Sequence, residues 1–150
     1  MTKPRTLRLD GFLPYRLSIA TNMVSDIIAR AYRTMFGLNI PEWRLLAVLA
    51  ESEGITQLEL SLATRMDKVT VSRAAAGLVE RKLALRTPNA ADKRSHLLSL
   101  TEQGRDLYRQ VAPKALALED AVLVDFDKAE VAQLMAMLER LEEAAQRLGP

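Results

Sequence analysis

The side chains best suited to chemistry in this chain of 150 residues are basic or carry hydroxyl groups, and they gather in two short stretches. The first is the run Lys-Val-Thr-Val-Ser-Arg at 68–73, and the second carries Arg86, Lys93 and Arg94 around a loop that contains a proline. Ammonium and guanidinium groups bind phosphate oxygens, and a guanidinium can also pair with the edge of a guanine. These residue types therefore indicate contacts with DNA.

The distribution of charge along the chain supports this interpretation. Residues 65–96 contain eight Lys or Arg against three Asp or Glu, which gives a local net charge of +5. Residues 115–150 contain three Lys or Arg against eight Asp or Glu, which gives −5. A basic centre and an acidic end predict one face that meets phosphates and another that is kept away from them.

Two predicted helices position the first basic stretch. The segment Thr56-Gln-Leu-Glu59 fits a capping box, in which the Thr56 and Glu59 side chains accept hydrogen bonds from backbone amides at the start of a helix. A short turn that carries Arg65 leads to a second helix, which is expected from Asp67 to about Lys82. The order helix, short turn, helix is typical of DNA-reading units.

A predicted β-hairpin positions the second basic stretch. The apolar runs 83–87 and 95–100 flank the polar loop 88–93, and this pattern indicates two strands joined by a loop longer than a tight turn. The hairpin follows the second helix directly, as a wing does in a winged helix-turn-helix.

The second helix is expected to have two distinct faces at about 100° per residue. The face toward the core is expected to hold Val71, Ala75, Leu78, Val79 and the stem of Lys82. The opposite face is expected to hold Val69, Arg73, Ala76, Gly77 and Glu80, where the small side chains would permit a close approach to a surface. Lys68, Thr70 and Ser72 flank this outer face near the end that usually enters the major groove.

The candidate residues are expected to divide into base contacts and phosphate contacts. Arg73 is expected to read a guanine edge, with Lys68 and Thr70 close to it. The expected phosphate contacts are Thr56, Gln57, Ser72, Arg86 and Lys93. The alternative for all of these residues is an ordinary solvated polar face.

Two motifs resemble the MarR family of bacterial transcription regulators. They are Asp67-Lys-Val-Thr-Val-Ser-Arg73 and the wing signature Asp92-Lys-Arg94, which is followed by Leu100-Thr101-Glu-Gln-Gly104. The wing signature is the more specific of the two, and the resemblance covers almost the whole chain. It implies a mainly helical fold with a small β-wing: a winged helix-turn-helix between N- and C-terminal dimerisation helices. Arg65 is a departure, because a glycine often makes this turn in the family.

The same resemblance assigns roles to two wing residues. It implies that the Arg94 guanidinium enters a minor groove and that Asp92 pairs with it and holds it in place. The alternative is a surface salt bridge worth about 0–1 kcal/mol. His96 alternates with Leu97 on the second strand, and we expect it to be structural.

Apolar residues recur at helical steps near both ends of the chain. They predict a helix over Leu13–Phe36, one from Thr101 to about Leu123 that Pro113 should kink, and one after the capping box Asp127-Lys-Ala-Glu130. The apolar residues of the last helix are Val131, Leu134, Leu138, Leu141, Ala145 and Leu148. Such stripes can fold back on the chain's own core, but the resemblance favours a homodimer.

The expected organisation is a single domain over residues 1–150. Within it, residues 1–36 and 101–150 are expected to form dimerisation helices, and residues 41–100 are expected to form the winged helix-turn-helix. A helix over Pro41–Glu51 is expected to begin the DNA-binding region.

The resemblance also implies a small-molecule effector, often an aromatic acid or phenol, bound between the dimer helices and the winged helix. The candidate contacts are Tyr15, Arg16, Trp43 and Arg44; alternatively, Trp43 belongs to the core and Arg16 to the surface. The predicted function is therefore a homodimeric repressor of a palindromic operator in double-stranded DNA, released by such a ligand. The alternatives are an activator, a regulator without a ligand, or a protein-interaction module.

Several other classes of function lack the residues they need. The chain has no cysteine and one histidine, which excludes disulfides, thiol-based sensing and the usual transition-metal sites, and no cofactor is expected. It lacks a paired nucleophile and base and a glycine-rich phosphate loop, so an enzyme is not expected. No apolar stretch approaches the ~20 residues of a membrane span, and the basic N-terminus lacks a signal segment. We expect a bacterial cytoplasmic protein that associates with the nucleoid through DNA.

Overall fold

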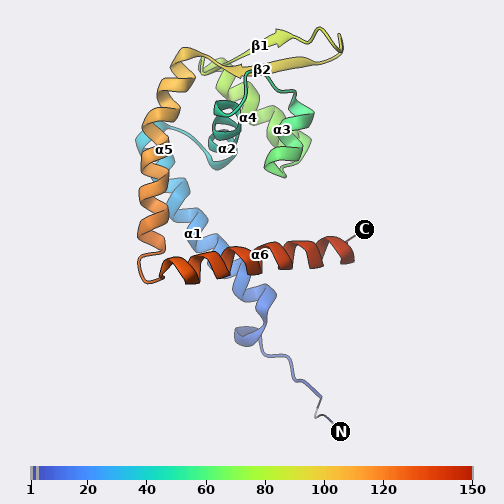
Figure 1. Cartoon of the computed structure of the whole chain (residues 1–150), viewed down its shortest axis with the longest axis vertical. Helices are drawn as coiled ribbons and strands as arrows, with labels where there is room; N and C mark the ends of the chain where they lie inside the picture. The colour runs from blue at the N-terminus through green and yellow to red at the C-terminus, as the bar shows by residue number, and fades with distance from the viewer. Residues whose placement is uncertain (1, 3, 150) are drawn as a thin grey trace. The chain divides into compact units, whose positions relative to one another are not determined.

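The structure, a computed structural model, describes residue 2 and residues 4–149, which divide into two units (Figure 1). The first unit extends to Lys114 and the second begins at Ala115. The architecture is mainly helical with one two-stranded antiparallel sheet, as the sequence predicted. The elements in chain order are η1 (Leu9–Gly11), α1 (Leu13–Phe36), α2 (Ile40–Ala50), α3 (Gln57–Thr64), α4 (Lys68–Glu80), β1 (Ala84–Pro88), β2 (His96–Leu100), α5 (Glu102–Val122) and α6 (Lys128–Leu148).

Helix α1 has the predicted bounds, because Gly37 ends it in the left-handed conformation at φ 64°. Helix α2 begins one residue earlier than predicted and ends at Ala50. Its start is fixed by a capping box that the sequence analysis missed: Asn39 Oδ1 accepts from the Glu42 amide at 2.8 Å, and Glu42 Oε1 accepts from the Asn39 amide at 3.1 Å. The first turn of α2 is therefore fixed by hydrogen bonds to the residue that directly precedes the helix.

The capping box at the start of α3 is confirmed. Thr56 Oγ1 accepts from the Glu59 amide at 3.2 Å, and Glu59 Oε2 accepts from the Thr56 amide at 2.9 Å. Arg65 ends α3 in the left-handed region at φ 54°, a conformation that glycine adopts more readily than residues with a Cβ.

Helix α4 ends at Glu80, before the predicted Lys82. Lys82 has φ 60°, and the Leu83 amide donates to the Leu78 carbonyl at 2.9 Å. This is the hydrogen bond of a Schellman motif, in which glycine usually takes the left-handed position. Lys82 therefore lies outside the helix and is exposed, so its stem does not extend the core-facing side of α4.

The core of the first unit lies where α2, α3, α4 and the hairpin meet. Its most deeply buried large side chains are Leu38, Leu45, Leu46, Leu49, Leu60, Val71, Leu78, Leu98 and Val111. The predicted inner face of α4 is confirmed at Val71, Ala75 and Leu78. Ala74 is also buried, which was not predicted, and Val79 is only half-buried.

The β-hairpin has the register Ala84↔Leu100, Arg86↔Leu98 and Pro88↔His96. Each strand begins one residue later than predicted, and Pro88 is the last residue of β1 rather than part of the loop. Ile55 exchanges two backbone hydrogen bonds with Leu98, at 3.0 and 2.8 Å. The segment before α3 is thereby attached to the base of the hairpin.

The Thr and Gly of the wing signature join the hairpin to α5. Thr101 Oγ1 accepts from the Gly104 amide at 3.0 Å and donates to the Lys82 carbonyl at 2.7 Å, so the predicted Thr101 cap is confirmed. A Cβ on Gly104 would lie 2.0 Å from the Leu83 carbonyl oxygen, so any side chain there would clash with backbone. This part of the signature is structural.

The second unit contains the end of α5 and the whole of α6. The predicted capping box at α6 is confirmed, with Asp127 Oδ1 accepting from the Glu130 amide at 2.8 Å and Glu130 Oε2 accepting from the Asp127 amide at 2.9 Å. No residue of α6 is buried. Pro113 lies inside α5. None of the described helices combines the length and the apolar character that crossing a membrane requires.

Candidate nucleic-acid interface

The first candidate surface is the N-terminal end of α4. Lys68, Ser72 and Arg73 are exposed there, on the side of the helix away from the buried Val71, Ala74, Ala75 and Leu78. Val69 between them is 60% exposed. This end of the helix therefore presents two cations and a hydroxyl group to solvent on a rigid element.

Asp67 caps α4 through Thr70. Asp67 Oδ1 accepts from the Thr70 amide at 2.8 Å, and Asp67 Oδ2 accepts from the Thr70 hydroxyl at 2.9 Å. These hydrogen bonds lower the pKa of the Asp67 carboxyl below its ordinary value, and the one from the Thr70 backbone amide has the largest effect. Because the Thr70 hydroxyl donates to Asp67, Thr70 has a structural role in this structure, and only its oxygen lone pairs are available to a donor.

One prediction for the outer face of α4 is wrong. Gly77 was expected to face outward with Arg73 and Ala76, but a Cβ at Gly77 would lie 3.1 Å from Glu42 Oε2 on α2. Glu42 itself is only 9% exposed. The missing side chain at Gly77 therefore allows α4 to pack closely against α2. Ala76 is exposed, as predicted.

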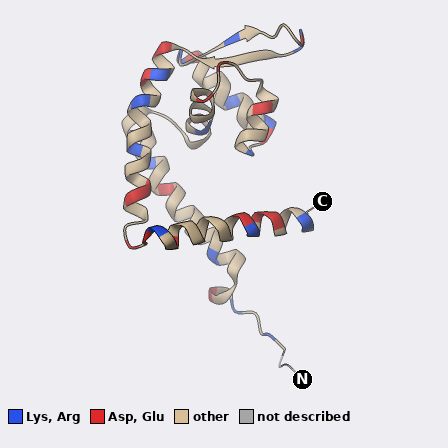
Figure 2. Ribbon diagram, in the orientation of Figure 1, with Lys and Arg blue, Asp and Glu red and all other residues tan. Residues whose placement is uncertain are grey.

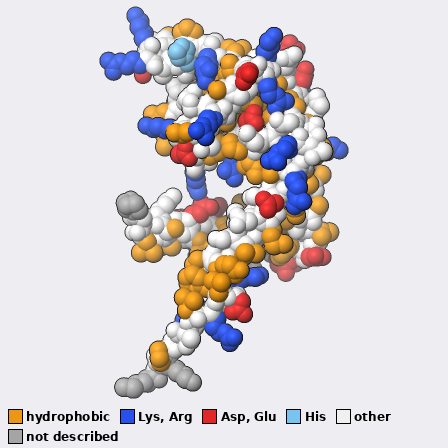
Figure 3. Space-filling view, turned by 180° about the vertical axis from the view of Figure 1, so that it is seen from behind, with side chains coloured by type: hydrophobic (Ala, Val, Ile, Leu, Met, Phe, Trp, Pro, Cys, Tyr) orange, Lys and Arg blue, Asp and Glu red, His pale blue; other side chains and the backbone are white. Residues whose placement is uncertain are grey.

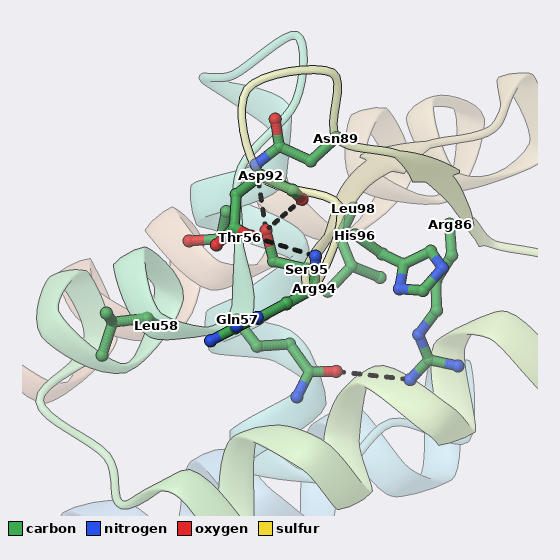
Figure 4. A pocket seen from close by; sticks show the side chains of 10 residues that line it. All are labelled: Thr56, Gln57, Leu58, Arg86, Asn89, Asp92, Arg94, Ser95, His96 and Leu98. Carbon is green, nitrogen blue, oxygen red and sulfur yellow. Dashed lines mark hydrogen bonds between the residues drawn. The ribbon is translucent and has the colours of Figure 1, made fainter.

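The second candidate surface is a concave site of about 430 Å³ between the wing and the start of α3 (Figure 4). It brings together five of the predicted residues: Thr56, Gln57, Arg86, Asp92 and Arg94. Arg86 Nη2 donates to Gln57 Oε1 at 3.4 Å across the site. Two guanidinium groups and the polar start of a helix thus line one hollow, an arrangement suited to phosphate oxygens.

Three polar residues of this hollow were not among the predicted contacts. Asn89, Ser95 and His96 also line it. Asn89 Oδ1 accepts from the Ala91 amide at 3.1 Å, and its Nδ2 donates to Ser95 Oγ at 3.0 Å. Asparagine after proline in a polar loop is a turn signal, which could have identified Asn89 from the sequence.

Asp92 contacts the backbone of Arg94. Asp92 Oδ1 accepts from the Arg94 amide at 3.0 Å, and within the described part of the chain no ion pair joins the two side chains. The pairing with the guanidinium that the resemblance implied is therefore absent here. Asp92 shapes the wing tip as an Asx turn does, and the Arg94 side chain extends into the hollow (Figure 4).

Basic side chains project from the winged-helix unit around these two surfaces. Figure 2 shows Lys and Arg on α4 and at the wing tip, and Figure 3 shows basic side chains extending from the same end of the unit. Lys93 is exposed in the wing loop but does not line the hollow. The predicted residues therefore occupy three places: the start of α4, the hollow, and the tip of the wing.

The predicted effector contacts are only partly brought together. The ring of Trp43 lies near two tyrosines: its centroid is 5.3 Å from that of Tyr32 and 6.1 Å from that of Tyr108, whose ring is nearly parallel to the Trp43 ring. Burial raises the pKa of Tyr32. Tyr15 is half-buried on α1, and Arg16 and Arg44 are exposed, with no contact described between them and Trp43. Tyr32 and Tyr108 were missed because their proximity to Trp43 depends on how α1, α2 and α5 pack.

Known proteins resemble this arrangement. A sequence model of the MarR family matches residues 36–95, from the end of α1 to the wing. A regulator of the helix-turn-helix type from Staphylococcus aureus, described as uncharacterized, is 29% identical over 82 residues. That alignment covers 55% of this chain and 56% of the relative, so the chain matches about half the length of the curated relatives.

The likeness extends over nearly the whole chain in solved structures. The crystal structure of a MarR/EmrR family transcriptional regulator from Acinetobacter sp. ADP1 has a TM-score of 0.84 and is 28% identical, covering 94% of this chain and 99% of that one. The central part of the chain is thus similar in sequence to MarR-family regulators, and the chain shares their fold over most of its length. The structure of BpsR from Bordetella bronchiseptica is 21% identical with a TM-score of 0.86; the match covers 92% of this chain and 98% of BpsR, so the two share a fold. The MarR family and fold are those of transcription regulators, not of enzymes.

Proposed function

We propose that this chain is a homodimeric, sequence-specific DNA-binding regulator of transcription of the MarR type. The observation that carries the proposal is the exposure of Lys68, Ser72 and Arg73 at one end of α4, a helix whose other side is buried in the winged-helix core. A helix anchored in this way can enter a major groove with its first turns, where Arg73 pairs with a guanine edge. Lys68 lies beside Arg73 at the end that enters the groove, and Ser72 meets a neighbouring phosphate.

The wing supplies the second part of the DNA contact. Arg94 enters the adjacent minor groove, while Arg86 and Lys93 contact phosphates. Thr56 and Gln57 lie at the start of α3, where backbone amides point outward and favour an anion. Support comes from the hollow that places Arg86, Arg94 and Gln57 around one space (Figure 4).

The dimer is formed by α1 and α6. On α1, Leu13 and Met23 are 54% and 63% exposed, and on α6, Leu134 and Leu141 are 40% and 38% exposed. Figure 3 shows hydrophobic side chains gathered along α1. Exposed apolar surface of this kind favours association with a second copy. Two-fold symmetry then presents two α4 helices to one face of a palindromic operator, about one DNA turn apart.

The regulator acts as a repressor that an aromatic or acidic small molecule releases. BpsR offers a parallel, since its DNA binding is regulated by 6-hydroxynicotinic acid. In this chain we expect the effector to contact Trp43 together with Tyr15, Arg16 and Arg44. Because Trp43 is the single tryptophan, its fluorescence reports the site directly. Saturable quenching by 6-hydroxynicotinic acid, with a parallel loss of operator binding, is the expected result.

The DNA-binding role is tested by comparing Arg73→Ala with Lys93→Ala on a duplex selected by the parent protein from a random pool. Arg73→Ala should cost about 1–3 kcal/mol on that duplex and relax the preference at one symmetric pair of positions. Lys93→Ala should weaken all duplexes similarly and lower the slope of log affinity against log salt by about one. The exposed Arg33 on α1 provides a matched control, because Arg33→Ala removes a cation outside both surfaces. The DNA-binding proposal fails if the parent shows neither sequence preference nor salt dependence.

A further inference from the structure

Arg81 connects the end of α4 with the end of α1. It is the C-cap residue of α4, and its guanidinium donates from Nη1 to the Gly37 carbonyl at 3.0 Å and from Nη2 to the Phe36 carbonyl at 3.1 Å. Phe36 is the last residue of α1, and Gly37 is its left-handed cap. The last carbonyls of a helix lack partners within it, and the negative end of the helix dipole lies there. The Arg81 guanidinium is a planar, charged fork, so it can donate to both carbonyls and also place a positive charge at the negative end of the dipole.

A second contact attaches α4 to the same junction. Gly77, one turn before Arg81, lies so close to α2 that a Cβ there would be 3.1 Å from Glu42 Oε2. Glu42 is in turn bound to Asn39 through the capping box that begins α2. The C-terminal turn of α4 is therefore hydrogen-bonded to the carbonyls of residues 36 and 37 and packs closely against Glu42. The other end of the same helix presents Lys68 and Arg73 to solvent.

We propose that Arg81 fixes the angle between α1 and α4 and thereby sets the separation of the two DNA-reading helices in the dimer. The consequence for DNA rests on the proposed function. If α1 belongs to the dimer interface, the orientation of α1 also determines that of α4, because the Arg81 guanidinium on α4 is hydrogen-bonded to the carbonyls of residues 36 and 37. A small rotation at this attachment displaces the far end of α4, so Arg81 determines which half-site spacing the dimer accepts. Arg81 is thus a positioning residue and not a DNA contact.

We call the two hydrogen bonds from Arg81 to the carbonyls of Phe36 and Gly37 the clamp, and it is tested without DNA by measuring a distance inside one protomer. The chain contains no cysteine, so Asn22→Cys on α1 and Val69→Cys on α4 give two unique sites for spin labels. Dilution with unlabelled chain keeps at most one labelled protomer in each dimer. Arg81→Ala and Arg81→Lys should broaden or shift the distance distribution, because alanine removes both hydrogen bonds and lysine lacks the fork. Arg33→Ala, which removes a cation near the same end of α1, should leave it unchanged. A folded Arg81→Ala with the parent distribution overturns the proposal.

Two further measurements keep the outcomes distinct. If Arg81→Ala does not fold, as its circular dichroism spectrum would show, Arg81→Lys decides, and an unchanged distribution in that variant overturns the clamp. The second measurement uses selected operators with one base pair removed or added between half-sites. In the Arg81 variants, the ratio of affinity for the best spacing to affinity for the altered spacings should be about fivefold smaller than in the parent, a factor equivalent to one hydrogen bond. A variant that broadens the distance while the parent itself shows no spacing preference would support the clamp and refute the palindrome-binding dimer.

Discussion

The carboxylate of Asp92 accepts a hydrogen bond from the backbone amide of Arg94, with 3.0 Å between Oδ1 and N. The contact holds the wing loop in a turn, and it leaves the guanidinium free to extend into the hollow beside α3. Asparagine can accept the same hydrogen bond, because its side-chain oxygen occupies the position of Oδ1. Asp92 thus acts by holding the conformation of the wing loop, and a neutral side chain with the same oxygen should hold it equally well.

Asp92→Asn should therefore retain operator affinity, or increase it, because a negative charge near phosphate is removed. Asp92→Ala should weaken binding by about 1 kcal/mol, since the loop loses the hydrogen bond that orders Arg94. Affinities of both variants at one fixed salt concentration check this prediction. Equal weakening by Asn and Ala would instead show that the negative charge itself orients the guanidinium.

Asp67 should make the stability of the fold depend on pH in the acid range. Hydrogen bonds from the Thr70 amide and hydroxyl lower its pKa in the folded state. Its stabilisation is therefore fully present above the ordinary value of 3.8 and is lost as the pH falls through the lowered folded pKa. The Asn variant keeps a capping oxygen but does not titrate.

The measurement is urea unfolding of the parent and Asp67→Asn from about pH 7 to about pH 3. The free-energy difference between the two proteins should stay constant near neutral pH and shrink at the acid end. Asp125→Asn is the control, because no described hydrogen bond engages the Asp125 carboxylate. A difference that is the same at every pH would show that the cap contributes nothing through its charge.

Leu138→Asp should abolish dimer formation and operator binding together. Leu138 belongs to the apolar stripe of α6, a helix that has no buried residue in the single chain. If the stripe is buried between two copies, an unpaired carboxylate there is strongly disfavoured. Gln133→Asp adds the same charge to an exposed position off the stripe and should change neither property. Light scattering measures the mass, and a dimeric Leu138→Asp protein with normal binding would exclude α6 from the interface.

Lys82→Gly should stabilise the protein by about 1 kcal/mol. Lys82 adopts φ 60°, a conformation that costs a residue with a Cβ roughly 1–2 kcal/mol and glycine almost nothing. Part of the gain is offset by the greater freedom of glycine in the unfolded chain. Lys82→Ala keeps the Cβ and should give no stabilisation. Urea unfolding of the three proteins at one pH checks the ranking, and a Gly variant less stable than the parent would contradict it.

Local patterns in the sequence were sufficient for several parts of the structure. The capping boxes at Thr56 and Asp127, the stop at Gly37 and the cap at Thr101 were all predicted and are all present. Each depends on hydrogen bonds between residues that lie within about two helical turns of one another in the sequence. The wing signature and the mainly helical winged fold were also recognised from residue order alone.

Tertiary structure decided the features that depend on contacts between distant elements. Periodicity placed Gly77 on the outer face of α4, but its proximity to Glu42 follows from how α2 crosses α4. In the same way, Trp43 meets Tyr108 only because α5 passes beside α2, and Arg81 reaches Gly37 across 44 positions of the chain. Helical periodicity specifies the direction of a side chain about its own axis. It does not specify which neighbouring element lies in that direction, because this is decided by the packing of the whole core.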